Sequence, residues 1–386
     1  MTREKSSDSA RRSARRSLRS ARDTRGSTIR QTKNTFWPLQ DKSGGRLWVS
    51  DIMLLLEMSN KTSFDLLGKK FDSPFFWSVR YRLLEMSEIT EMTEEERLMK
   101  ITYGDIVHHK KITNFTKRID FNTLENYSAL INERKFCGNK ILYHYMTDEL
   151  CKTKPKSGIS LFEIMNDPVQ KKKLVEKTIK LGRTGTDENR LFEASRFNGA
   201  IVFFKPATAK FIYKKFGATC VLDPCMGWGG RLLGAVSLGI RYVGFDTNKE
   251  LEKPYDAMTN FIMSIPGKSC SCSYTFQSCM DADFAPIDYD FVLTSPPYIN
   301  LERYSHMTPF ESDAKYYKEF LIPLINKCLA HIKRNGWVCF NINQKMYKDL
   351  KAYGMRPADQ EENFLQQKKM GKDMADMVYC WRNNSV

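Results

Sequence analysis

The chain has 386 residues, long enough for two folded units and a tail, and carries 61 Lys and Arg residues against 45 Asp and Glu residues. The formal net charge of +16 favours nucleic acid as the partner over an acidic protein or a membrane surface. No hydrophobic run reaches membrane-spanning length and no signal peptide is visible, so no membrane partner is expected.

Residues 1–40 are predicted to form a disordered basic arm. Arg and Ser dominate this segment, as in the run 11–17, and almost nothing apolar is present to build a core. The arm is interpreted either as a tail that binds the phosphate backbone through counterion release or as a nuclear-import signal. A transit peptide would also be rich in Arg and Ser, but Glu4, Asp8 and Asp23 argue against one.

Residues 41–190 are predicted to be mostly helical. They are the candidate for the part that recognises a nucleic-acid target. Three short helices are expected, at residues 49–57, 63–69 and 73–84. The third combines aromatic residues with Arg80 and Arg82, which fits either a Myb-type helix-turn-helix unit or an ordinary helical bundle. The acidic residues between 91 and 96 do not fit a continuous DNA-binding face. Further along, Lys171, Lys172, Lys173 and Arg183 are expected either to contact nucleic acid or to be solvated.

A short buried strand, a glycine-rich turn and a helix are predicted over residues 219–238. Glycine is needed where the backbone approaches a ligand or adopts conformations closed to residues with a Cβ atom, so Gly227, Gly229 and Gly230 mark a cofactor cradle. A dinucleotide site requires a further glycine at position 232, where Leu232 stands. NAD is therefore disfavoured.

A second strand, at residues 241–245, ends at Asp246 and precedes a helix that starts near residue 249. A carboxylate at the end of the second strand of a doubly wound sheet can accept both ribose hydroxyls of a nucleoside cofactor. Asp246 is therefore predicted to bind the ribose. The next strand, at residues 274–276, leads into a segment that contains Asp281 and Asp283.

The apolar run 291–293 is predicted to be a buried strand, and five residues directly after it form a rigid cup for a flat ring that bears an amine. The Ser295 hydroxyl and the Pro296 carbonyl can accept the amine hydrogens, and the prolines fix φ. Tyr298 offers a face for an unstacked base. The five residues are Thr294, Ser295, Pro296, Pro297 and Tyr298.

The remaining elements complete an α/β sheet. A helix is expected at residues 316–331, a strand at 337–342, and an antiparallel closing pair near 362–365 and 377–381. Upstream, the apolar segment 200–206 precedes a predicted helix that runs to residue 215.

The Ser-Pro-Pro-Tyr segment and the upstream residues Asp223, Pro224, Gly227 and Gly229 resemble the S-adenosylmethionine-dependent DNA amino-methyltransferase family, whose members methylate cytosine N4 or adenine N6. The Thr-Ser-Pro-Pro-Tyr variant, with the later aromatic Tyr304, is most similar to the cytosine-N4 branch. Two residues depart from the family pattern, since Cys225 replaces the usual Phe and Trp228 stands between the glycines.

This resemblance implies a Rossmann-like, seven-stranded methyltransferase sheet over residues 191–386. It also implies that residues near 204 pack over the methionine part of the cofactor, although a plain core helix fits them as well. It further implies that Asp281, with Asp283 as the alternative, contacts the adenine. The implied cofactor-binding residues are Phe204, Pro206, Asp223, Pro224, Gly227, Gly229, Asp246 and Asp281, and the implied catalytic residues are Thr294, Ser295, Pro296, Pro297 and Tyr298.

The expected reaction is methyl transfer from S-adenosylmethionine to an exocyclic amine of a DNA base, with cytosine N4 favoured over adenine N6. Two alternatives stay open: an RNA base methyltransferase, and a non-catalytic nucleic-acid-binding protein that keeps the fold. The 10 cysteines show no paired zinc spacing, so no metal is expected and reduced thiols in an intracellular compartment, either nucleus or cytoplasm, are the default.

Overall fold

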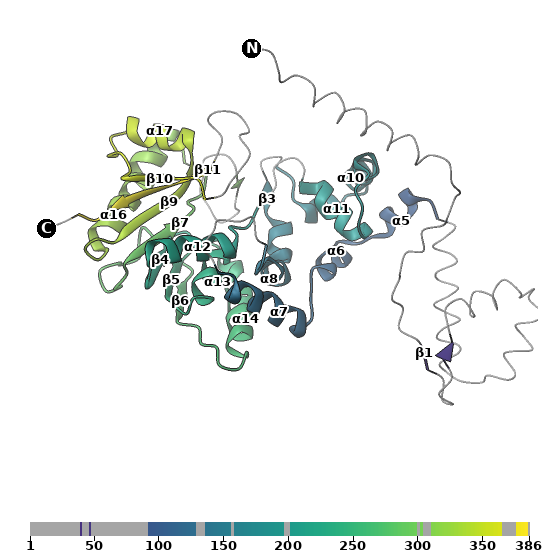
Figure 1. Ribbon diagram of the computed structural model, residues 1–386. Coiled ribbons are helices and arrows are strands. Elements are labelled where there is room, and N and C mark those ends of the chain that lie inside the picture. The colour runs from purple at the N-terminus through teal and green to yellow at the C-terminus, as the bar shows by residue number, and fades with distance from the viewer. Residues whose placement is uncertain are drawn as a thin grey trace, which may run out of the picture. The chain divides into compact units, whose positions relative to one another are not determined.

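The computed structural model of the protein describes residues 39–40, 46–47, 92–128, 136–155, 158–196, 201–298, 302–303, 310–364 and 376–384 (Figure 1). The chain divides into two compact units, residues 1–88 and 89–386. In the first unit, β1 (Leu39–Gln40) pairs antiparallel with β2 (Arg46–Leu47). The predicted arm, apart from its last two residues, and the three predicted short helices lie outside the described residues.

The described residues between 92 and 196 are mainly helical, as the sequence predicts. Several of these helices begin at a capping box, in which the hydroxyl of Thr93, Thr102 or Ser160 and an acidic side chain three residues later satisfy the first backbone N–H groups. The helices are α5 (Glu94–Lys100), α6 (Tyr103–His109), α7 (Asn114–Asn126), α8 (Asn139–Lys152), α9 (Leu161–Asn166), α10 (Pro168–Leu181) and α11 (Asp187–Ser195).

A seven-stranded sheet forms the centre of the second half, in the order β10-β11-β9-β7-β4-β5-β6. Strand β11 runs antiparallel to both of its neighbours, whereas β6, β5, β4, β7 and β9 are parallel. The strands are β4 (Cys220–Asp223), β5 (Arg241–Phe245), β6 (Cys272–Thr275), β7 (Phe291–Thr294), β9 (Trp337–Asn343), β10 (Gln360–Glu362) and β11 (Asp376–Arg382). The predicted seven-stranded Rossmann-like sheet is confirmed, including its closing antiparallel pair.

Helices cover both faces of this sheet, so alternate residues of one strand belong to different cores. Val221 of β4 packs on the face that carries α12 (Pro206–Phe216), α13 (Gly230–Val236) and α14 (Glu252–Met263). Its neighbour Leu222 packs on the face that carries the π-helix η3 (Tyr316–Leu321), α16 (Ile322–His331) and α17 (Gln344–Ala352). The sequence did not predict α17.

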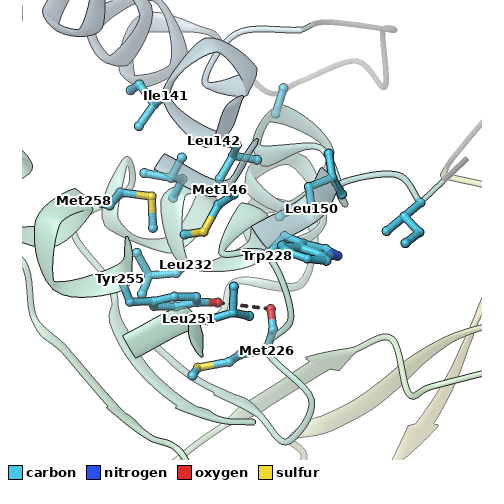
Figure 2. Packing of buried hydrophobic residues seen from close by; sticks show 14 of the residues in the cluster. Ile141, Leu142, Met146, Leu150, Met226, Trp228, Leu232, Leu251, Tyr255 and Met258 are labelled. Atoms are coloured by element: carbon cyan, nitrogen blue, oxygen red, sulfur yellow. Dashed lines mark hydrogen bonds between the residues drawn. The ribbon is translucent and has the colours of Figure 1, made fainter. Parts of the chain in front are cut away.

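The helices before residue 196 share a hydrophobic core with the helices on one face of the sheet. Figure 2 shows side chains of α8 beside residues of the glycine-rich turn, α13 and α14. The labelled members include Ile141, Leu142, Met146 and Leu150 of α8, with Trp228, Leu232, Tyr255 and Met258 from the sheet side. The predicted division of the chain near residue 190 stays a prediction.

Two polar connections add to this packing. The buried Lys210 ammonium of α12 donates hydrogen bonds of 2.8, 2.6 and 2.9 Å to the carbonyl oxygens of Leu124, Glu125 and Tyr127, at the end of α7 where such carbonyls lack intrahelical partners. In addition, β8 (Glu302–Arg303) pairs antiparallel with β3 (Lys154–Pro155), which connects the segment after the Ser-Pro-Pro-Tyr motif to the helical part of the unit.

Candidate active site

The two motif segments meet at the carboxyl ends of neighbouring strands. Strands β4 and β7 lie side by side in parallel, and the chain continues from β4 toward β5 and from β7 toward β9, on opposite sides. This is a topological switch point, where α/β sheets bind their ligands. The backbone N–H of Cys225 donates a 3.1 Å hydrogen bond to Thr294 Oγ1, so the turn after β4 contacts the end of β7 directly.

The glycine-rich turn depends on glycine for two separate reasons. Gly227 has φ 53° and Gly229 has φ 81°, in the left-handed region that favours glycine. Gly230 has a different constraint, because a Cβ atom there would lie 1.8 Å from the Phe204 carbonyl oxygen. At Gly227 a Cβ atom would meet nothing within 4 Å, so this part of the turn faces open space.

Tyr255 of α14 is hydrogen-bonded to the backbone of the glycine-rich turn. Its hydroxyl donates to the carbonyl oxygens of Gly227 at 2.8 Å and Met226 at 3.3 Å, the second of which Figure 2 draws. Burial, followed by the nearby Asp246 and Asp223, raises the pKa of Tyr255 well above its usual value, so the hydroxyl remains a donor.

Trp228, which departs from the family pattern, lies in the hydrophobic core. Its side chain is 8% exposed and its ring centroid lies 6.0 Å from that of Phe203. Trp228 and Leu150 of α8 belong to the same buried cluster, and Figure 2 draws both. The hydrophobic core therefore accommodates the large Trp228 side chain, although this residue stands between Gly227 and Gly229 in the sequence.

Asp246 lies at the end of β5 and contacts the glycine-rich turn. Its Oδ2 accepts the backbone N–H of Gly227 at 2.8 Å, and its Oδ1 accepts that of Asn248 at 2.9 Å. The side chain is half-buried. These two bonds orient the carboxylate at the edge of the turn that faces open space.

Asp223 is fully buried in an ion pair that the sequence did not predict. Its Oδ2 accepts hydrogen bonds of 2.7 Å from Arg231 Nε and 2.7 Å from the Tyr242 hydroxyl. Its Oδ1 has no hydrogen-bond partner among the described residues. Burial alone would lower the pKa of Arg231, but the adjacent Asp223 carboxylate outweighs burial and raises it. An Arg within an otherwise apolar helix was the only sequence signal for this pair.

Arg231 also connects the upstream segment to the turn. Its guanidinium donates to the Cys225 carbonyl oxygen at 2.5 Å and lies over the Phe204 ring, 5.2 Å from the centroid. Phe204 is half-buried, and Pro206 is buried at the first turn of α12. The structure therefore brings Phe204 beside the start of α13, whereas Pro206 lies beside Gly234 further along this helix. Pro224 is buried directly after β4.

Asp281 is exposed in a turn that a lysine of α16 holds in place. Lys327 Nζ donates to the carbonyl oxygens of Cys279 at 3.0 Å, Met280 at 2.8 Å and Ala282 at 2.5 Å. One ammonium group thus supplies donors to three carbonyls around Asp281. The sequence did not point to Lys327.

The five residues of the predicted cup differ in their surroundings. Thr294 is fully buried and its hydroxyl is engaged by Cys225, whereas the half-buried Ser295 hydroxyl has no hydrogen-bond partner within the described part of the chain. Pro296 is buried, and the half-buried Tyr298 donates a long 3.4 Å hydrogen bond to the Asn341 carbonyl oxygen. The Pro297 carbonyl oxygen accepts a 2.8 Å hydrogen bond from the Tyr316 hydroxyl.

Three findings bear on ligands and membranes. Within the described ranges, no group of three or more His, Cys, Asp or Glu side chains is arranged to bind a metal ion. The cysteines that the structure describes are free thiols. No helix in the described part of the chain combines the length and apolar character needed to cross a membrane. Tyr304 lies outside the described residues.

The chain was compared with known proteins. No family model matches it, and no curated protein matches it. Among solved structures it is similar to an RNA methyltransferase from Salinibacter ruber in complex with S-adenosyl-L-homocysteine, at 13% identity over 48% of this chain and 95% of that chain, with a TM-score of 0.32.

Two further similar structures have comparable values. The tRNA m1G37 methyltransferase of M. jannaschii shows 12% identity over 48% of this chain and 53% of that chain, with a TM-score of 0.33. An S-adenosylmethionine-dependent methyltransferase from Neisseria gonorrhoeae shows 10% identity over 49% of this chain and 78% of that chain, with a TM-score of 0.32.

Proposed function

We propose that the protein transfers a methyl group from S-adenosylmethionine to an exocyclic amine of a DNA base, with cytosine N4 favoured over adenine N6. The observation that carries this proposal is the 3.1 Å hydrogen bond between Cys225 N–H and Thr294 Oγ1. It joins the glycine-rich turn to the Ser-Pro-Pro-Tyr segment at the switch point of the sheet. A donor at the first segment and a base at the second would therefore lie within reach of each other.

The residues of the turn fit S-adenosylmethionine. The open space at Gly227 lets a ligand approach the backbone, and Asp246 presents its carboxylate at the same edge for the ribose hydroxyls. The buried Asp223 Oδ1 lacks a donor among the described residues, and an ammonium such as that of the cofactor's methionine part would satisfy it. When bound, the cofactor supplies an electrophilic methyl group.

The Ser-Pro-Pro-Tyr residues would orient the accepting amine. An exocyclic amine is a weak nucleophile because its lone pair is delocalised into the ring. The Ser295 hydroxyl and the Pro296 carbonyl would accept its two hydrogens and favour a more tetrahedral nitrogen, whose lone pair points at the methyl carbon. Tyr298 would support the ring of a base that has left the stack.

The rest of the chain would hold the polymer. The net charge of +16 suits a phosphodiester backbone, and the basic arm at residues 1–40 would add sequence-independent affinity. We assign target recognition to residues 41–190 and catalysis to residues 191–386. The free thiols of the described residues are compatible with a reducing intracellular compartment.

Methyl transfer by the full-length chain tests the proposal. The protein is incubated with tritiated S-adenosylmethionine and, separately, with duplex DNA, single-stranded DNA and single-stranded RNA of equal length and composition. Label is expected in DNA. Label confined to RNA would change the proposed substrate from DNA to RNA, and no label in any polymer would contradict the proposal.

Two variants separate cofactor binding from base binding. Asp246→Ala should weaken binding of S-adenosylhomocysteine in calorimetry, whereas Tyr298→Ala should leave that affinity unchanged and lower the transfer rate. Asp288→Ala is the control, because this carboxylate is 72% exposed, pairs with Lys333 at 2.9 Å, and precedes β7 at the end of the strand away from Ser295. Unchanged cofactor affinity in Asp246→Ala would contradict the ribose assignment.

A further inference from the structure

A tyrosine of η3 contacts the Ser-Pro-Pro-Tyr segment, on the face of the sheet against which Tyr298 also packs. Tyr316 is 1% exposed, and its hydroxyl donates a 2.8 Å hydrogen bond to the Pro297 carbonyl oxygen. By contrast, the Pro296 carbonyl has no hydrogen-bond donor among the residues that the structure describes. One of the two proline carbonyls is therefore already engaged before any base arrives.

The ring of Tyr316 has little room to move. It lies in the π-helix η3, and both Tyr316 and the next residue, Tyr317, are 1% exposed. Their rings meet edge to face with centroids 5.2 Å apart. The rings of Phe310 and Phe320 pack against Tyr316 at 5.1 and 5.6 Å. π-Helical turns are rare and frequently occur at functional sites.

The Tyr316 hydroxyl acts as a donor rather than as a base. Burial, followed by the nearby Cys225 and Tyr317, raises the pKa of Tyr316 well above its usual value. The group therefore remains protonated at neutral pH, and a protonated hydroxyl can donate to a carbonyl that accepts.

We propose that Tyr316 is a positioning residue for methyl transfer: by engaging the Pro297 carbonyl, it fixes the Pro-Pro-Tyr segment and leaves the Pro296 carbonyl and the Ser295 hydroxyl to receive the target amine. This inference rests on the proposed function. The acceptors must lie within about 0.5 Å of the productive geometry, because a misplacement of about 1 Å can cost about 100-fold in rate.

Tyr316→Phe removes the hydroxyl and keeps the ring packing. The matched control is Tyr317→Phe, since Tyr317 is equally buried and adjacent, yet its hydroxyl donates at 3.2 Å to Asp349 Oδ2 on α17. Both variants lose one buried hydroxyl. Only the first loses the contact with Pro297.

Three quantities are measured for each variant: the melting temperature, the affinity for S-adenosylhomocysteine by calorimetry, and the single-turnover rate of methyl transfer with saturating cofactor and nucleic acid. Both variants should melt at similar temperatures and bind S-adenosylhomocysteine as the unmodified protein does. Tyr316→Phe should lower the single-turnover rate about tenfold or more, and Tyr317→Phe should stay within about twofold.

Equal single-turnover rates in the two variants would overturn the positioning role, and so would a loss of rate in Tyr316→Phe that merely follows a lower melting temperature. Failure of the underlying function gives a different result, because the unmodified protein would then transfer no methyl group at all.

Discussion

Arg231 Nε donates a 2.7 Å hydrogen bond to Asp223 Oδ2, and the two side chains are 4% and 0% exposed. The pair joins the end of β4 to the first turn of α13, on either side of the glycine-rich turn. The second carboxylate oxygen of Asp223 has no donor among the described residues. The positive charge of Arg231 is therefore the main compensation for the buried negative charge of Asp223.

Replacing Arg231 should therefore destabilise the fold. Arg231→Met leaves the Asp223 carboxylate buried without its cation, which should lower the free energy of unfolding by about 3–5 kcal/mol in urea denaturation. The double variant Asp223→Asn/Arg231→Met should recover part of the loss, because no uncompensated charge remains. Arg241→Met, at the exposed start of β5, is the control and should change stability by no more than about 0.5 kcal/mol. Equal stability of the two Arg variants would refute this account of the pair.

Substitutions at two glycines of the turn should distinguish an effect on cofactor binding from an effect on stability. Gly227→Ala adds a methyl group where no atom lies within 4 Å, so the strain of φ 53° should cost only about 1–2 kcal/mol. The methyl group enters the space that the cofactor would fill, and affinity for S-adenosylhomocysteine should fall at least about tenfold. Gly230→Ala forces the Phe204 backbone to move and should cost about 3 kcal/mol or more.

Calorimetry and urea denaturation of both glycine variants check this contrast. If Gly227→Ala bound S-adenosylhomocysteine as tightly as the unmodified protein, the open side of the turn would not be the cofactor site.

Replacing Lys327 should weaken cofactor binding rather than slow the transfer step. Lys327→Met removes the donors to three carbonyls around Asp281, so this turn should loosen and affinity for S-adenosylhomocysteine should drop several-fold, while the rate at saturating cofactor changes little. Lys327→Arg keeps a cation and should retain most of the affinity. Lys318→Met, exposed on the same helical segment, serves as the control. A rate defect that persists at saturating cofactor would argue for another role.

His144 predicts a pH dependence of stability. Burial, then Lys117 and Lys111, lower the pKa of His144 from 6.5 to about 4, and its Nδ1 accepts the backbone N–H of Ile112 at 2.9 Å. The unfolded chain takes up the proton at higher pH than the folded chain does. The stabilisation is thus complete above about pH 6.5 and is lost as the pH falls through about 4.

The His144→Asn variant tests this linkage, because its amide oxygen can still accept the Ile112 N–H. The difference in unfolding free energy between the unmodified protein and the variant should shrink as the pH falls from 6.5 to 4. A difference that stays constant over this interval would exclude His144 as the source.

Short apolar runs followed by special residues could be located from the sequence almost to the residue. The strand predicted at 241–245 is β5, and the run 291–293 before the Thr-Ser-Pro-Pro-Tyr segment is β7 with one further residue. Buried parallel strands are continuously apolar, and an acid or a proline ends them, so both limits are encoded locally. The helix α17 was missed although its polar N-cap, Asn343, stands directly before it.

The supporting contacts of the site could not be predicted in the same way. Arg231, Tyr316 and Lys327 act through bonds to backbone or side-chain atoms that lie 6 to 48 positions away in the chain, which periodicity and turn chemistry do not encode. The pairing of β3 with β8 involves two residues on each strand and carries no sequence pattern of its own. The motif alone located predicted cofactor-binding residues such as Asp223, but the side chains that hydrogen-bond to them could be identified only from the three-dimensional structure.

Mass analysis of nucleosides tests the central claim most directly, because it identifies both the polymer and the modified atom. Duplex DNA and single-stranded RNA are incubated separately with the full-length protein and S-adenosylmethionine, digested, and compared with reactions that contain the Asp246→Ala variant. The account predicts N4-methylcytosine, or N6-methyladenine as the second choice, with far less in the variant. Unmodified nucleosides from both DNA and RNA, under conditions where the protein binds S-adenosylhomocysteine, would contradict it.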